Sequence, residues 1–145
     1  MGWLDRMKRS LSTGAGIVGT TPSAQFSSPL ELVHAALTRF ESSRVRNGGW
    51  VSFRIRDTFA NQLGIIQYAG DGLVNLCDRD DIDPGALLRS AGREDLAARC
   101  EERDSAMYAV ADATVEDITL LIDLVLAAAF GAPTGVLIEA EIESG

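Results

Sequence analysis

Residues 49–77 constrain the fold of this chain more than any other segment, because three short strand patterns follow one another there. The strands are predicted at residues 50–56, 63–68 and 73–77. The glycine-rich turn at residues 69–72 is a strong hairpin signal between the second strand and the third. Three consecutive strands with such short connections predict an antiparallel meander.

The first predicted strand alternates between apolar and polar side chains. Its apolar residues are Val51, Phe53 and Ile55, and the polar residues between them are Ser52, Arg54 and Arg56. An alternation of this kind is typical of an antiparallel strand with one side on the core. It predicts a sheet with one buried face and one face in water.

Polar side chains of the first two strands form a candidate partner-binding patch. Arg54 and Arg56 project from the predicted wet face, and Gln67 or Tyr68 on the neighbouring strand could join them. The alternative is that these are ordinary outward-facing polar residues. The buried side of the second strand is left open between two choices, Leu63 with Ile65 or Ile66 with Tyr68.

Two amphipathic helices flank the predicted strands. Ser28 and Glu31 form a capping box around Pro29, which starts the first helix. The second long helix follows a cap at residues 112–114 and ends at Gly131. This order predicts an α+β fold, with an antiparallel meander sheet of four to five strands packed against N-terminal and C-terminal helices.

Shorter elements fill the space between the meander and the closing helix. Asp83 is predicted to cap a short helix, and residues 94–101 read as another helical piece. Residues 107–111 are predicted to form a fourth strand. Residues 136–143 alternate as a strand does, but we expect this segment to be unpaired.

Three regions are predicted along the chain. Residues 1–27 are a flexible arm with a short amphipathic helix, residues 28–133 are a single domain, and residues 134–145 are an acidic tail. In the arm, Trp3, Met7 and Leu11 share one helix face beside a basic side made by Arg6, Lys8 and Arg9. Such a segment can dock on the domain, fray, or lie on a membrane surface, and docking or disorder is favoured.

The acidic balance of the chain limits its partners. The 145 residues carry a formal net charge of −8, which argues against a general nucleic-acid binder because phosphate binding depends on Lys and Arg. Lys8 is the only lysine, against twelve arginines. Together with abundant alanine, glycine and aspartate, this usage is typical of a high-GC bacterial source.

Targeting and redox signals both favour the cytoplasm. No apolar segment follows the charged residues 1–9, as a signal peptide would require. The longest apolar run, residues 118–130, contains Asp123 and is too short to cross a bilayer. Cys77 and Cys100 lack CxxC spacing and are expected to be reduced thiols, with a structural disulfide as the alternative.

No catalytic or metal-binding pattern is found in the sequence. His34, the only histidine, lies beside an apolar helix stripe, and no nucleophile elbow is present. The GxGxxG match at residues 14–19 lacks the strand before it and the helix after it. Residues 78–83 fail the EF-hand pattern, since Ile82 and Arg89 occupy ligand positions. We therefore expect no enzyme activity, no cofactor and no metal, and leave open whether the acidic cluster binds a cation.

The order of elements resembles the type III secretion chaperone-like fold, and more narrowly is similar to its actinobacterial TY-Chap and YbjN-like relatives. The resemblance rests on residues 49–51 at the start of the sheet, on residues 64–69 with Gln67 beside Tyr68, and on residues 114–131 at the end. Between Ser90 and Met107 the chain departs from the family, which has a further strand there. The family offers no catalytic residues, and the resemblance implies a small, acidic, often dimeric module that binds an extended or helical segment of another protein.

The leading hypothesis is therefore a non-enzymatic, chaperone-like protein-binding module in the cytoplasm. The alternative is a structural or adaptor component of a larger assembly, which could be membrane-associated. In that case Trp3, Met7 and Leu11 would form the attachment surface.

Overall fold

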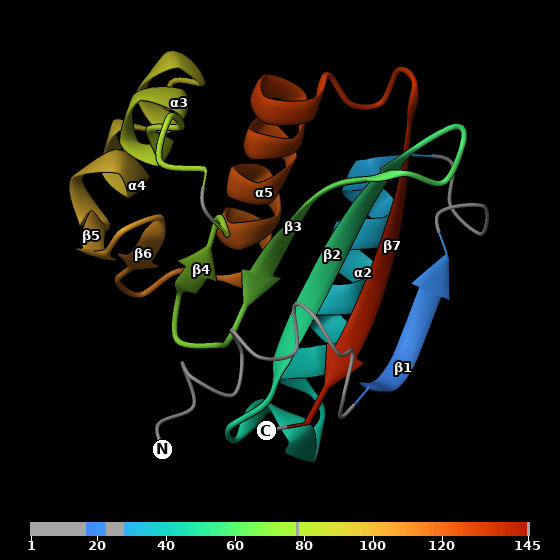
Figure 1. Cartoon of the computed structure of the whole chain (residues 1–145). Coiled ribbons are helices and arrows are strands. Elements are labelled where there is room, and N and C mark those ends of the chain that lie inside the picture. Colours follow the sequence, from blue (N-terminus) through green and yellow to red (C-terminus); the bar gives the residue numbers. More distant parts are fainter. Residues whose placement is uncertain (1–16, 23–27, 78, 145) are drawn as a thin grey trace.

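The computed structural model of the chain describes residues 17–22, 28–77 and 79–144. It has the predicted α+β class, with one antiparallel sheet and helices packed on one of its faces (Figure 1). The described part contains seven strands in the spatial order β1-β7-β2-β3-β4-β6-β5. The sheet is therefore larger than the predicted four or five strands.

The helical elements are α2 (Pro29–Glu41), the 3₁₀ turn η2 (Arg44–Arg46), α3 (Pro84–Ser90), α4 (Glu94–Arg99) and α5 (Val115–Phe130). The strands are β1 (Ile17–Pro22), β2 (Trp50–Asp57), β3 (Gln62–Tyr68), β4 (Leu73–Asn75), β5 (Cys100–Asp104), β6 (Met107–Val110) and β7 (Val136–Glu143). None of the helices in the described ranges is long and apolar enough to cross a membrane.

Local capping starts and ends the two long helices where the sequence predicts. The Ser28 hydroxyl accepts a hydrogen bond of 3.3 Å from the Glu31 amide, ahead of the first turn of α2. Thr114 and Asp117 form a reciprocal capping box at the start of α5. Gly131 ends α5 with a φ of 70°, a left-handed conformation that glycine adopts at little cost.

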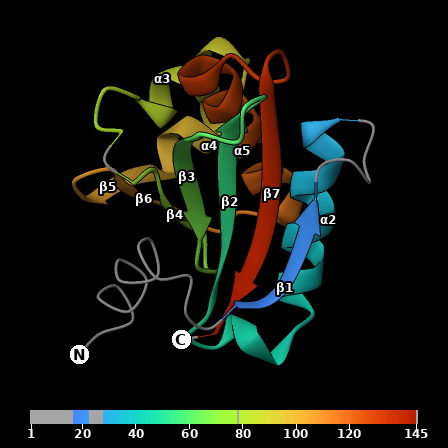
Figure 2. The ribbon, with the colours of Figure 1, turned by 45° about the vertical axis from the view of Figure 1, so that its right-hand side comes forward.

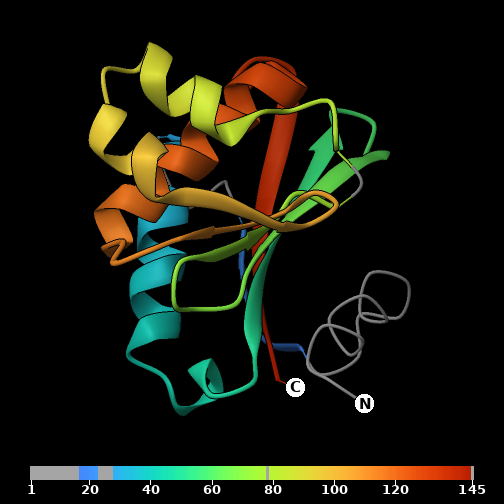
Figure 3. The same cartoon turned by 90° about the vertical axis from the view of Figure 1, so that its left-hand side faces the viewer.

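The core lies between the helices and one face of the sheet. The inward residues of β2 are Val51, Phe53 and Ile55, and they belong to one buried cluster with the α5 residues Ile118, Leu121, Ile122 and Val125. Figure 3 shows the helices on one side of the strands. Ile66 and Tyr68 join this cluster, which decides between the two alternatives left open for the second strand.

The expected boundary at residue 133 is wrong, because β7 is an inner strand of the sheet. It pairs with β2 along its whole length, from Asp57 opposite Val136 to Trp50 opposite Glu143, and with β1 on its other side (Figure 2). Its alternation places Ile138 in the core. Residues 136–143 were expected to form an unpaired acidic tail, and the pairing partners that contradict this lie far away in the sequence.

Two further strands were not predicted. Residues 17–22 of the expected flexible arm form β1, which pairs with β7. Residues 100–104 form β5, which pairs with β6, so that α4 ends at Arg99 and the strand thought to be missing between Ser90 and Met107 is present. The predicted helix with Trp3, Met7 and Leu11 lies outside the described residues.

Candidate binding face

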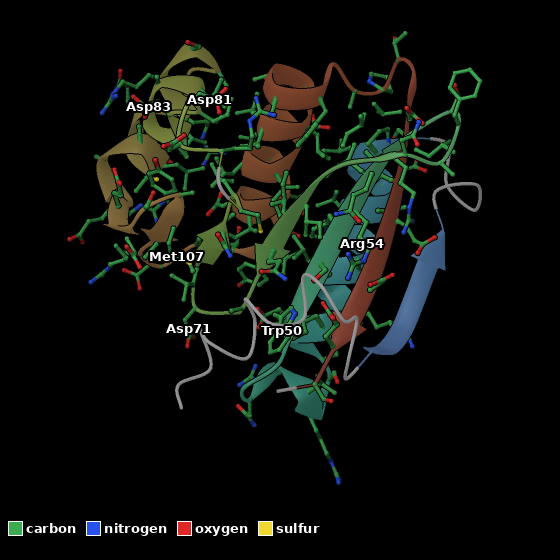
Figure 4. The ribbon with its side chains drawn as sticks, viewed as in Figure 1. Trp50, Arg54, Asp71, Asp81, Asp83 and Met107 are labelled. Atoms are coloured by element: carbon green, nitrogen blue, oxygen red, sulfur yellow. The ribbon has the colours of Figure 1, made fainter. Side chains whose placement is uncertain are left out.

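The sheet face opposite the helices is the candidate functional surface, and we call it the open face. The register of the strands places on it Trp50, Ser52, Arg54 and Arg56 of β2, Gln67 of β3, Asn75 of β4, and Glu139, Glu141 and Glu143 of β7. Figure 4 views this side and labels Trp50 and Arg54. All described helices lie behind it.

The prediction that this face is wet is wrong at its centre. Ser52, Gln67 and Glu143 each have 0% of their surface exposed, and Arg54 has 7%. Polar side chains are excluded from solvent only when their hydrogen bonds are made inside the protein. The central residues of the open face make these bonds to one another, except at one oxygen of Glu143.

A directed chain of hydrogen bonds crosses four strands of the open face. The Asn75 Nδ2 group donates to Gln67 Oε1 at 3.2 Å, Gln67 Nε2 donates to Ser52 Oγ at 3.1 Å, and the Ser52 hydroxyl donates to Glu143 Oε2. Gln67 lies directly opposite both Ser52 and Asn75 in the ladders. Each donor therefore points toward the carboxylate, a direction that suits an ionised acceptor.

Glu143 is the end point of this chain of hydrogen bonds. Its Oε2 atom accepts from Ser52 and also from the Trp50 indole nitrogen at 2.8 Å. Its Oε1 atom is buried and has no hydrogen-bond partner, the single such side-chain atom found in the described residues. A buried acceptor without a donor costs about 1–3 kcal/mol. The carboxylate therefore has room for one more donor.

Two ion pairs connect β2 to β7 farther along the open face. Arg54 Nε donates to Glu141 Oε2 at 2.7 Å, with both side chains 8% exposed. Arg56 lies 3.7 Å from Glu139, with about a third of each side chain exposed. The structure thus places the predicted patch residues Arg54, Arg56 and Gln67 on one face, but the contacts of Arg54 and Gln67 are made within the protein.

Tyr68, the remaining predicted patch residue, lies on the opposite, helix-covered face. Its hydroxyl donates to Glu41 Oε1 at 2.8 Å, and its ring meets Phe40 edge to face. Burial, followed by the hydrogen bond to Glu41, raises the pKa of Tyr68 well above its ordinary value. Tyr68 therefore belongs to the core and does not contribute to the open face.

Three large apolar side chains are exposed together at one end of the sheet, and we call them the apolar end cluster. They are Phe59 (85% exposed), Leu63 (47%) and Leu137 (51%). Arg56 of β2 lies opposite Leu137 of β7 on one side. On its other side it lies opposite Gln62 of β3, the residue before Leu63. The prediction from sequence missed this cluster, because Leu137 joins it only when β7 pairs with β2.

The turn that carries Phe59 is held in place by Asp57. One carboxylate oxygen accepts from the amides of Phe59 at 2.8 Å and Asn61 at 2.9 Å, and the other accepts from the Asn61 side chain at 3.0 Å. These bonds, above all those from Asn61, lower the pKa of Asp57. The exposed ring is thus presented from an ordered turn.

Among the described residues, His34 and the two cysteines are not assembled into a catalytic site. His34 contacts Glu116 at 3.3 Å on the rim of a hollow of about 390 Å³ between α2 and α5, where Leu30, Thr119 and Leu120 supply no nucleophile paired with the imidazole. Cys77 and Cys100 are not joined in a disulfide bond.

The acidic cluster near α3 has local partners. Asp83 caps the helix through a 3.2 Å bond from the Ala86 amide, and Asp81 pairs with Arg79 at 2.8 Å. Figure 4 labels both carboxylates. Within the described ranges no group of three or more His, Cys, Asp or Glu side chains could hold a metal ion.

Comparisons with protein-family models, with curated proteins and with solved structures found no match to this chain. The resemblance to the chaperone-like family therefore stays a prediction, and the functional argument depends on the geometry of the open face and of the apolar end cluster.

Proposed function

We propose that this chain is a non-enzymatic, chaperone-like protein-binding module that holds a segment of a partner protein at the apolar end cluster. The observation that supports this proposal is the exposure of Phe59, Leu63 and Leu137 at the same end of the sheet, where the two leucines lie on the strands on either side of Arg56. Contiguous exposed apolar residues on a folded protein mark interaction surfaces more often than single ones do.

The properties of the cluster suggest the chemistry of the partner. An aromatic side chain on an ordered turn loses little conformational entropy on binding, which suits it to act as an anchor. The partly exposed pair of Arg56 and Glu139 lies beside the leucines and can form polar contacts at the edge. A partner segment with an apolar side and a polar margin fits this surface.

The alternative function, an adaptor attached through Trp3, Met7 and Leu11, depends on residues outside the described ranges and stays a prediction. Attachment to a membrane surface, the cytoplasmic location and a homodimer also stay predictions. The formal net charge of −8 supports a protein partner over a nucleic acid.

Site-specific photo-crosslinking tests the proposal. A photoreactive amino acid replaces Phe59 in cells that make the protein, and the control replaces Ser90, an exposed residue at the end of α3 on the helical side. We expect a defined protein adduct from position 59 that is lost when Leu63 and Leu137 are changed to serine. Equal adducts from both positions, or adducts that survive the serine changes, would contradict the proposal.

A further inference from the structure

The centre of the open face is polar and buried, although none of the described helices lies over it. Ser52, Gln67 and Glu143 have no exposed surface, and Trp50 has 1%. We propose that residues 1–16 of this same chain dock across the open face, with the apolar residues Trp3, Met7 and Leu11 on β4 and β6 and with Arg6 and Lys8, which flank them, toward the carboxylates.

The path of the chain favours this occupant. Ile17, the first residue of β1, pairs with Glu143 in the ladder, so residues 1–16 join the sheet beside the carboxylate with the unpartnered oxygen. From β1, where Ile17 lies, to β6 the distance is five strand spacings, about 24 Å. A helix of nine residues is about 13 Å long, and five further residues reach up to about 17 Å. The segment is therefore long enough to cross the face.

Charge complementarity points the same way. Residues 1–16 carry a net charge of +2, from Arg6, Lys8 and Arg9 against Asp5, which leaves −10 on the rest of the chain. On the open face, β7 contributes three carboxylates and β2 contributes only two arginines, so negative charge is in excess there. A guanidinium or ammonium group from the segment would supply the donor that Glu143 Oε1 lacks.

The apolar side of the segment also has a counterpart. A hollow of about 410 Å³ lies over β4 and β6, with an apolar floor of Leu73, Met107 and Ala109 and a rim of Asp71, Arg103 and Asp104. Asp71 and Met107 are labelled in Figure 4. An amphipathic helix with Trp3, Met7 and Leu11 on one side matches an apolar floor with a charged rim.

The single lysine of the sequence makes a direct test possible. A carbodiimide joins an amine to a carboxylate in contact with it, and Lys8 is the only side-chain amine of the full chain. We expect peptide mapping to show Lys8 linked to a carboxylate of the open face or of the rim of the hollow, namely Glu139, Asp71 or Asp104. In about 1 M salt, where screening acts over about 3 Å, the yield should fall several-fold.

A matched variant controls for random coupling. Lys8→Arg with Arg39→Lys moves the only lysine to the exposed outer side of α2 and keeps the net charge. This variant should lose the links to the open face, because α2 lies on the other side of the sheet. Links from Lys8 that reach the helical carboxylates as often as the open face would overturn the proposal.

Quenching of Trp50 by acrylamide gives an independent readout, in full chains that carry Trp3→Phe. Reversing Arg6, Lys8 and Arg9 to glutamate should raise the quenching constant of Trp50 at least twofold. Reversing three exposed arginines elsewhere, Arg39, Arg44 and Arg89, makes the same change in charge and should leave it unaltered. Circular dichroism confirms that both proteins fold. Equal protection of Trp50 in the two variants would also overturn the proposal.

Discussion

Replacing Glu143 by alanine tests whether the hydrogen-bond chain of the open face stabilises the fold. The substitution leaves the Trp50 indole and the Ser52 hydroxyl, both buried, without their acceptor. Each hydrogen bond to a charged group contributes about 1.5–3 kcal/mol, and the substitution removes two of them. We therefore expect a loss of roughly 3–6 kcal/mol in the free energy of unfolding.

Two further variants separate the hydrogen bonds from other effects. Glu143→Gln keeps an oxygen that can accept both donors, and its loss should be smaller, about 1–2 kcal/mol. Glu139→Ala removes a carboxylate from the same strand, but one that is partly exposed and 3.7 Å from Arg56. Exposed pairs of this kind contribute about 0–1 kcal/mol, so this variant is the control.

Urea unfolding followed by far-UV circular dichroism measures these differences. With a slope of about 1–3 kcal/mol per molar urea, a loss of 3 kcal/mol lowers the midpoint by about 1–3 M. The slopes of all three variants must agree with that of the parent chain for the comparison to hold. A midpoint for Glu143→Ala no lower than that for Glu139→Ala would refute the reasoning.

Three other predictions follow from the helices and their contacts. Leu121→Ala, at a residue 1% exposed in the core, should lower the free energy of unfolding by about 2–5 kcal/mol, and an unchanged urea midpoint would contradict its place there. The hydrogen bond from Arg93 lowers the pKa of Asp95 from 3.8 to about 2, so the contribution of this pair is present above pH 3.8 and is lost as the pH falls toward 2. Arg93→Ala should return the pKa of Asp95 toward 3.8 in an NMR titration, and a midpoint that stays near 2 would exclude Arg93 as the cause. Burial raises the pKa of Cys100 above 9.0, so its alkylation at pH 8 should be slower than that of an unfolded control, and equal rates would contradict the burial.

Local signals in the sequence predicted the local features of the fold. The caps at Ser28 and Thr114 depend on residues three positions apart, and both were found where expected. The meander also follows from short-range turns. By contrast, β5 has no apolar alternation to reveal it, because its residues 101–104 are all exposed. A charged edge strand of this kind looks like a loop in the sequence.

The candidate site could be predicted only in part, because its contacts are non-local. Arg54 was predicted to project from this face and Gln67 was one of two candidates to join it, but their polarity suggested contact with water. The carboxylate that pairs with Arg54 is 87 positions away, and the one that accepts from Ser52 is 91 positions away. Without knowledge that β7 lies beside β2, polar residues on an alternating strand are indistinguishable from solvated ones.

The place of β7 in the sheet has a consequence for synthesis on the ribosome. The pair of Trp50 and Glu143 spans 93 positions, and at about 5–20 residues per second β7 is made about 5–20 s after β2. During this interval one edge of β2 lacks its native neighbour, with its amides and carbonyls open to wrong pairing. The nascent chain is therefore most vulnerable to aggregation before its last strand is made, and the sheet closes around β7 as a late, long-range step.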